Sequence, residues 1–76
     1  MLREVPIRGE TIRLGQLLKL TGVVDSGAEI KAFLSAEAVL VNGESEDRRG
    51  RQLHPGDTVR VGGQELRLIS ATVPGP

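Results

Sequence analysis

The residues best suited to chemistry in this chain are three arginines within four positions, Arg48, Arg49 and Arg51. Guanidinium groups this close repel one another unless an anion lies near, and arginine binds phosphate through two parallel hydrogen bonds. The run therefore predicts a phosphate-binding loop. The alternative is a solvated loop in which neighbouring carboxylates neutralise the arginines. Those carboxylates are Glu44, Glu46 and Asp47.

A second feature suited to anions is the predicted start of a helix at Ser26. The run Ser26-Gly27-Ala28-Glu29 fits a capping box, in which the Ser26 hydroxyl accepts from the Glu29 amide. Free amides and the helix dipole favour an anion there, and Gly27 permits close approach of a phosphate. Lys31 lies one turn further on, and Lys19 lies late in the preceding predicted helix. If the helices pack side by side, these lysines and the arginine loop line one groove.

Catalytic and metal chemistry find little support in the sequence. Cysteine is absent, so no thiolate can act as nucleophile or ligand, and the single histidine, His54, cannot build a metal site alone. Carboxylates on an open loop beside three arginines all stay ionised, whereas acid–base catalysis needs two carboxylates with separated pKa values. We therefore predict no enzymatic activity, no cofactor and no metal site.

Size and composition restrict the class of protein. The chain has 76 residues and a net charge of zero, which argues against binding to nucleic acid by bulk charge but allows a dipolar surface. Phe33 is the one aromatic residue, so stacking of bases on exposed aromatic rings is not expected. No apolar run approaches the roughly 20 residues that span a bilayer, and the N-terminus lacks a signal-peptide core. We expect a cytoplasmic monomer with no membrane partner and no small-molecule substrate.

Apolar spacing predicts two helices and several strands. Leu14, Leu17 and Leu18 share one helical face, which predicts a helix over 14–21 that is closed by Gly22. The second helix is predicted over 27–36. Strands are predicted over 5–8, 11–13, 39–41, 58–61 and 64–69, with tight turns at 42–43, 54–57 and 62–63. Because Pro6 lacks an amide hydrogen, it is expected at the edge or the end of a sheet.

These elements predict an α+β domain in which two short helices pack on a small, mainly antiparallel sheet. We expect residues 1–76 to form one domain, with a core over about 5–70 and a flexible tail over 71–76. The expected core residues are Leu14, Leu17, Leu18, Phe33, Leu34, Val39, Val41, Leu53, Val59, Val61, Leu66 and Leu68.

The order of these motifs resembles the S4-like RNA-binding domain, also called the alpha-L motif. The matching runs are Leu17-Leu18-Lys19-Leu20, Gly22, Ser26 to Lys31, Val39-Leu40-Val41-Asn42-Gly43 and Pro55-Gly56-Asp57-Thr58-Val59. The resemblance extends to the small stand-alone bacterial members of the YaaA/YbcJ type. The two runs that match these stand-alone members are Leu14-Gly15-Gln16-Leu17-Leu18-Lys19-Leu20 and Asp47-Arg48-Arg49-Gly50-Arg51.

The resemblance implies a non-catalytic protein that binds structured RNA, in the first place ribosomal RNA, and that acts in ribosome assembly. In such domains the helix pair and the adjoining loop face the RNA. The positions carried over as RNA-binding are Lys19, Asp25, Ser26, Gly27, Lys31, Arg48, Arg49 and Arg51.

The chain departs from the family pattern at two positions. Gly27 stands where many members have an arginine, and Glu37 stands where the family usually has a glycine. A left-handed backbone at Glu37 would cost about 1 kcal/mol or more. The alternative is that the second helix ends in a different conformation.

Two other functions compete with RNA binding. A protein–protein adaptor with the same fold would show a weaker salt dependence of binding than an RNA-binding protein. A sulfur-carrier protein of the ubiquitin-like β-grasp type also carries Val-Asn-Gly-Glu and Gly-Gly motifs. Such a carrier needs its Gly-Gly as a free C-terminus, whereas Gly62-Gly63 is followed by thirteen residues here.

Overall fold

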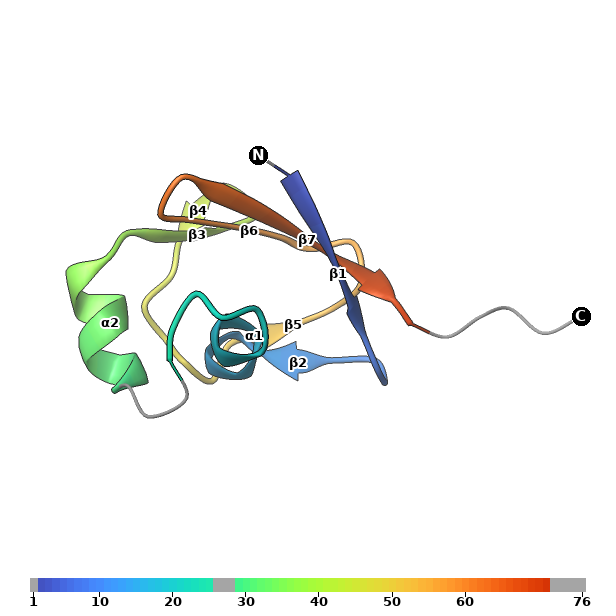
Figure 1. Cartoon of the computed structure of the whole chain (residues 1–76), viewed down its shortest axis with the longest axis horizontal. Helices are drawn as coiled ribbons and strands as arrows, with labels where there is room; N and C mark the ends of the chain where they lie inside the picture. Colours follow the sequence, from blue (N-terminus) through green and yellow to red (C-terminus); the bar gives the residue numbers. More distant parts are fainter. Residues whose placement is uncertain (1, 26–28, 72–76) are drawn as a thin grey trace, which may run out of the picture.

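The computed structural model describes residues 2–25 and 29–71, and it shows two short helices with a five-stranded and a two-stranded sheet (Figure 1). The larger sheet has the order β1-β7-β6-β3-β4. Its strands are β1 (Leu2–Ile7), β7 (Gln64–Ser70), β6 (Thr58–Val61), β3 (Val39–Val41) and β4 (Glu44–Ser45). Only β1 and β7 pair in parallel among these. The predicted α+β fold with a mainly antiparallel sheet is confirmed.

The smaller sheet consists of two short strands that are distant in the sequence. β2 (Ile12–Arg13) pairs antiparallel with β5 (Gln52–Leu53), and Arg13 lies opposite Gln52. The loop predicted over 44–52 therefore begins and ends in short strands, because β4 and β5 flank it. Figure 1 shows this loop, in yellow, descending from β4 between α2 and α1 to reach β5.

The first helix forms where the leucine spacing predicts it. α1 (Leu14–Leu20) buries Leu14, Leu17 and Leu18 completely. It ends at Thr21, whose hydroxyl donates to the Leu17 carbonyl at 2.9 Å. Gly22 then takes a φ of 77°, the left-handed conformation expected of a residue that follows a helix.

The second helix starts later than predicted. α2 (Ile30–Ala36) has Glu29 as its N-cap, and the backbone of Glu29 is extended, with φ −79° and ψ 105°. The predicted start at residue 27 is therefore wrong. Ile30, in the first turn of α2, is buried and lies against Gly15 of α1. Ser26 and Gly27 lie outside the described residues.

The backbone at the end of α2 shows how the chain accommodates Glu37, which stands where the S4-like family usually has a glycine. Its φ of −112° and ψ of 139° are extended, so no left-handed strain arises there. The helix ends at Ala36, and the chain passes directly into β3. At seven residues each, α1 and α2 are too short to cross a membrane, and the described residues contain no longer helix.

The predicted core is buried except for Phe33, which is half-buried and packs against its rim. Val5 and Ile7 of β1, together with Val24 and Ile30, were not predicted and are buried too. β1 joins the core because it pairs with β7 along its whole length, from Leu2 opposite Glu65 to Ile7 opposite Ser70. β1 is an edge strand, as the position of Pro6 predicted. Of the predicted tail, Ala71 donates its amide to the Ile7 carbonyl at 2.9 Å, and residues 72–76 lie outside the described residues.

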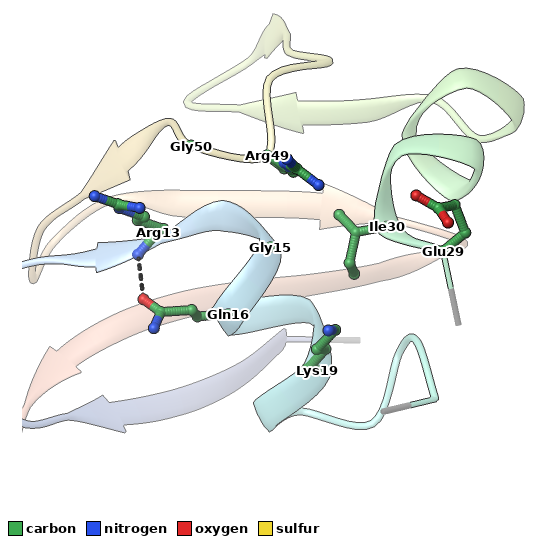
Figure 2. A pocket seen from close by; sticks show the side chains of 8 residues that line it. All are labelled: Arg13, Gly15, Gln16, Lys19, Glu29, Ile30, Arg49 and Gly50. Carbon is green, nitrogen blue, oxygen red and sulfur yellow. Dashed lines mark hydrogen bonds between the residues drawn. The ribbon is translucent and has the colours of Figure 1, made fainter. Parts of the chain in front are cut away.

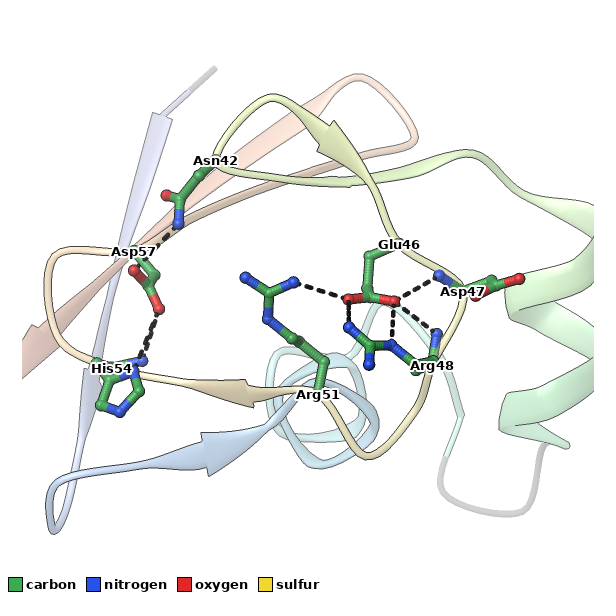
Figure 3. Close-up of polar contacts among 7 residues, drawn as sticks. All are labelled: Asn42, Glu46, Asp47, Arg48, Arg51, His54 and Asp57. Carbon is green, nitrogen blue, oxygen red and sulfur yellow. Dashed lines mark hydrogen bonds and ion pairs between the residues drawn. The ribbon is translucent and has the colours of Figure 1, made fainter.

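Two turn motifs that are distant in sequence bind each other. Asn42 and Gly43 have φ values of 52° and 83°, as an Asn-Gly hairpin turn requires. The Asn42 side chain accepts from the Thr58 amide at 2.9 Å. It also donates to the Asp57 carboxylate at 3.1 Å (Figure 3). Asp57 also accepts from the His54 amide at 2.8 Å. The β3–β4 turn and the 54–57 turn are thereby locked together.

Two substitutions of Asn42 separate the contribution of its side-chain hydrogen bonds from that of its left-handed backbone. Asn42→Gly removes the hydrogen bonds but suits the left-handed backbone, so we expect a loss of about 1 kcal/mol in the free energy of unfolding. Asn42→Ala also introduces left-handed strain, so we expect about 2 kcal/mol. Urea unfolding of both variants measures this order. Equal stability of the alanine variant and the wild type would refute the link between the turns.

Candidate nucleic-acid interface

The loop between β4 and β5 is organised by one buried carboxylate. Glu46 is 7% exposed and is the one charged residue buried among the described residues. Its amide donates to the Val39 carbonyl at 2.9 Å, which fixes its backbone beside β3. A charged group buried to this extent requires strong partners, because water no longer solvates it.

Those partners come from the loop itself (Figure 3). Oε2 of Glu46 accepts from the amides of Asp47 and Arg48, both at 3.1 Å, and from Arg48 Nε at 3.0 Å. Oε1 accepts from Arg48 Nη2 at 3.0 Å and from Arg51 Nη1 at 2.9 Å. Five hydrogen bonds thus converge on one carboxylate, and they bend the loop around it.

This arrangement keeps Glu46 ionised far into the acid range. The pKa of Glu46 is lowered from 4.5 to about 2. Hydrogen bonds from the Arg48 side chain are the largest cause of this shift, and the Arg48 amide and the Arg51 guanidinium contribute to it, although burial alone would raise the pKa. In return, the hydrogen bond to Glu46 raises the pKa of Arg48, so both groups are charged at neutral pH.

The backbone of the same loop is fastened to the start of α1. The Leu14 amide donates to the Arg51 carbonyl and the Gly15 amide donates to the Arg49 carbonyl, both at 2.9 Å. A Cβ at Gly15 would lie 3.4 Å from Arg49 Cβ, from the Arg49 carbonyl oxygen and from Ile30 Cγ2. A side chain at this position would therefore fit tightly where the loop, α1 and α2 meet.

The three arginines consequently have different roles. Arg48 and Arg51 bind Glu46, with side chains that remain 72% and 34% exposed. The exposed Arg49 side chain forms no ion pair or hydrogen bond with any other described residue. Neutralisation by carboxylates, the alternative that the sequence left open, thus holds for two of the three arginines. Arg49 is left available for an external anion.

Arg49 separates two hollows of the surface. The first has a volume of about 330 Å³ and lies beside α1 (Figure 2). Its lining residues are Arg13, Gly15, Gln16, Lys19, Glu29, Ile30, Arg49 and Gly50. The second has about 320 Å³ and lies beside α2, lined by Lys31, Leu34, Asp47, Arg48, Arg49 and Gly50. Lys19 and Lys31 therefore line two different hollows that share Arg49 and Gly50, instead of the single groove that was expected.

The other predicted site residues lie further from this centre. Arg51 lines a third hollow of about 610 Å³, together with His54 and Asp57. Asp25 is exposed and lines neither hollow beside Arg49. Ser26 and Gly27 lie outside the described residues, so the predicted anion site at a helix start near them has no structural description.

Sequence reasoning did not predict three polar residues of the first hollow, Arg13, Gln16 and Glu29, as site residues. Arg13 and Gln16 lie directly before and within α1, and the Arg13 amide donates to Gln16 Oε1 at 3.3 Å (Figure 2). The available signal was the alternation Ile12-Arg13-Leu14, which turns Arg13 away from the core. The pairing of β2 with β5 then places Arg13 next to the arginine loop, and local spacing does not reveal this pairing.

Comparison with known proteins gives two matches. A family model described as "S4 domain" matches residues 5–69, which run from β1 into β7. A curated protein of Bacillus subtilis (strain 168), described as "Probable ribosome maturation protein RlbA", is 49% identical over 63 residues. The match covers 83% of this chain and 89% of that protein.

Replacing Glu46 tests its part in the loop. Glu46→Gln removes the charge and turns an amide NH₂ toward the guanidinium groups, so we expect a loss of about 1–3 kcal/mol in the free energy of unfolding at pH 7. Glu44→Gln, on exposed β4, is the matched control and should change stability by less than about 0.5 kcal/mol. Equal stability of the two variants would contradict the assignment.

The pH dependence of stability follows from the same group. Because the pKa of Glu46 is about 2 in the folded protein and near 4.5 ordinarily, its contribution is complete above about pH 5 and is lost as the pH falls toward 2. Asp57 adds to this trend, since hydrogen bonds from His54 and Asn42 lower its pKa despite burial. Urea unfolding between about pH 5 and 2 should therefore show a weaker pH dependence in Glu46→Gln than in the wild type. An identical slope would exclude a depressed pKa for Glu46.

Proposed function

Because this chain belongs to the S4 domain family, we propose that it is a non-catalytic RNA-binding protein that acts in ribosome maturation. The ligand that we propose is structured RNA, and the specific RNA that we propose is ribosomal RNA. The family match supports RNA as the class of partner. The printed name of the relative from Bacillus subtilis supports the ribosome as the setting. We further propose that the protein acts as a cytoplasmic monomer of one domain.

The observation that carries this proposal is the position of Arg49. Its guanidinium has no partner among the described residues, and Arg49 lines both the hollow that contains Lys19 and the hollow that contains Lys31. Two further cations line the same hollows: Arg13 lies in the hollow of Lys19, and the exposed part of Arg48 lies in the hollow of Lys31. In a molecule of zero net charge, such a local cluster is the surface to which a polyanion binds.

The mechanism that fits this surface is recognition of the phosphate backbone. Arg49 donates two hydrogen bonds to a phosphate, while Lys19 and Lys31 act as point charges toward phosphates on either side. Phosphate contacts fix the position of the protein on a folded RNA, whose shape then supplies the selectivity. Asp25, Ser26 and Gly27 remain proposed contacts on the family resemblance alone.

Arg51 has a positioning role in this mechanism. Its guanidinium is used by Glu46 and its carbonyl accepts from the Leu14 amide, so it joins the loop to α1. Arg48 has a mixed role, because its Nε and Nη2 bind Glu46 while most of its side chain is exposed. Replacing all three arginines together would therefore disturb the loop as well as the binding surface.

Arg49→Ala tests the proposed contact, with Arg67→Ala as a control of equal charge on the outer face of β7. We expect Arg49→Ala to weaken binding to deproteinised Bacillus subtilis ribosomal RNA about tenfold and to reduce the log–log salt slope by about 1. Arg67→Ala should leave both nearly unchanged. Filter binding between about 50 and 200 mM salt measures both quantities. Equal losses in the two variants would mean that no particular surface is used, and wild-type protein that does not bind would contradict the proposed function.

Arg51→Ala distinguishes positioning from contact. It leaves Glu46 short of one charged partner, so we expect the free energy of unfolding to fall by about 1–3 kcal/mol. The salt slope of RNA binding should stay close to that of the wild type under conditions in which the variant is folded. A full unit lost from the slope, with unchanged stability, would make Arg51 a direct phosphate contact.

A further inference from the structure

We propose that the backbone of the bound RNA crosses the loop between β4 and β5 at Gly50, where a phosphate accepts a hydrogen bond from the Gly50 amide. This inference rests on the proposed RNA-binding function and adds to it a contact that involves no charged side chain. The backbone conformation of Gly50, the space around it and its amide carry the inference.

The fold does not require a glycine at position 50. The Arg51 amide donates to the Arg48 carbonyl at 3.2 Å, so residues 48–51 form a turn. Gly50 is not among the glycines with a positive φ, and turns without a positive φ accept most residue types at their central positions. A glycine there lowers stability, because it gives the unfolded chain more conformational freedom. The reason for this glycine therefore has to be sought in what binds to the loop.

The space around Gly50 is open, and it joins the hollows of this surface. A Cβ at Gly50 would meet no atom within 4 Å, whereas a Cβ at Gly15 would lie 3.4 Å from three atoms. Gly50 lines all three hollows around the loop, and Figure 2 shows it at the edge of the hollow beside α1. Among the described residues, it is the one that this hollow shares with the third hollow, which contains His54. A ligand chain that occupies both hollows therefore passes over Gly50, where a side chain would block its path.

The backbone of Gly50 offers a hydrogen-bond donor at this crossing. Gly50 is exposed, and its amide donates to no other described residue. Backbone amides are regular partners of phosphate oxygens in nucleic-acid-binding proteins. Because Gly50 has no Cβ, a phosphate can approach this amide closely.

The charges on the two sides of Gly50 suit an extended polyanion. In the hollow beside α1 and in the third hollow, the arginine and lysine side chains outnumber a single carboxylate. Their charge is spread over both sides of the loop, so a chain of phosphates matches it better than one compact anion. The cations are Arg13, Lys19 and Arg49 in the hollow beside α1, and Arg48 and Arg51 in the third hollow.

Side chains of increasing size at position 50 test this contact. Gly50→Ala and Gly50→Val are compared with Ser45→Val, which adds bulk on exposed β4 outside the three hollows. We expect binding to deproteinised Bacillus subtilis ribosomal RNA to weaken about fivefold in Gly50→Ala and about tenfold or more in Gly50→Val, as for overpacking of a close contact. Ser45→Val should bind like the wild type in the same filter-binding assay. The urea midpoint of Gly50→Ala should equal or exceed that of the wild type, because the folded chain has room for the methyl group.

The possible outcomes separate this contact from the proposed function. Wild-type affinity in both Gly50 variants, or an equal loss in Ser45→Val, would overturn the inference, and a loss in Arg49→Ala would then leave the proposed function standing. A urea midpoint of Gly50→Ala below that of the wild type would show that the fold itself needs the glycine, which would also overturn the inference. Wild-type protein that does not bind ribosomal RNA would contradict both proposals.

Inorganic phosphate identifies the source of the phosphate group. Added at constant ionic strength, it should not displace ribosomal RNA from the wild type, because the contact at Gly50 belongs to a longer chain of phosphates. Displacement in the wild type that is lost in Gly50→Val would assign the Gly50 amide to free phosphate and contradict an RNA source.

Discussion

The ion-paired carboxylate of Glu46 is the constraint on which the proposed binding surface depends. It is buried, it accepts hydrogen bonds from two guanidinium groups and two amides, and it therefore fixes both the backbone and the side chains of the arginine loop. Two of the three arginines are thereby used inside the protein. Of the three, Arg49 alone forms no ion pair or hydrogen bond through its side chain with the described residues, and its backbone is held because its carbonyl accepts from the Gly15 amide of α1. The buried Glu46 carboxylate thus gives the arginine loop a defined conformation, in which the Arg49 side chain forms no ion pair with the described residues.

The rest of the fold holds this loop between two helices. Pairing of β2 with β5 brings Arg13 beside it, and the missing Cβ at Gly15 allows the loop and Ile30 to approach α1. On the far side, the hydrogen bonds between Asn42 and the Asp57–Thr58 segment join the ends of β3 and β6. Cations from four separate parts of the sequence therefore meet on one surface. Zero net charge is compatible with RNA binding for this reason, since only the local density of charge matters at short range.

The sequence predicted most of the framework, because its signals there are local. Leucines at helical spacing located α1, alternating residues located β6 and β7, and the Asn-Gly pair located a turn whose backbone is left-handed. The order of motifs identified the family, which the family match confirms. The predicted start of α2 was wrong, because the backbone of Glu29 is extended and the helix begins at Ile30, which is buried. The choice of Glu46 over Glu44 and Asp47 as partner of the arginines depends on burial, and no local pattern separates the three carboxylates.

The most direct test of this account is a carbon-detected NMR titration of the Glu46 side-chain carboxyl in the folded protein. The hydrogen bonds from Arg48 and Arg51 predict a midpoint at about pH 2, with the neighbouring Arg48 and Arg51 signals shifting in the same step. A midpoint near 4.5, the ordinary value for a glutamate, would show that the carboxylate does not hold the guanidinium groups and would contradict the proposed origin of the binding surface.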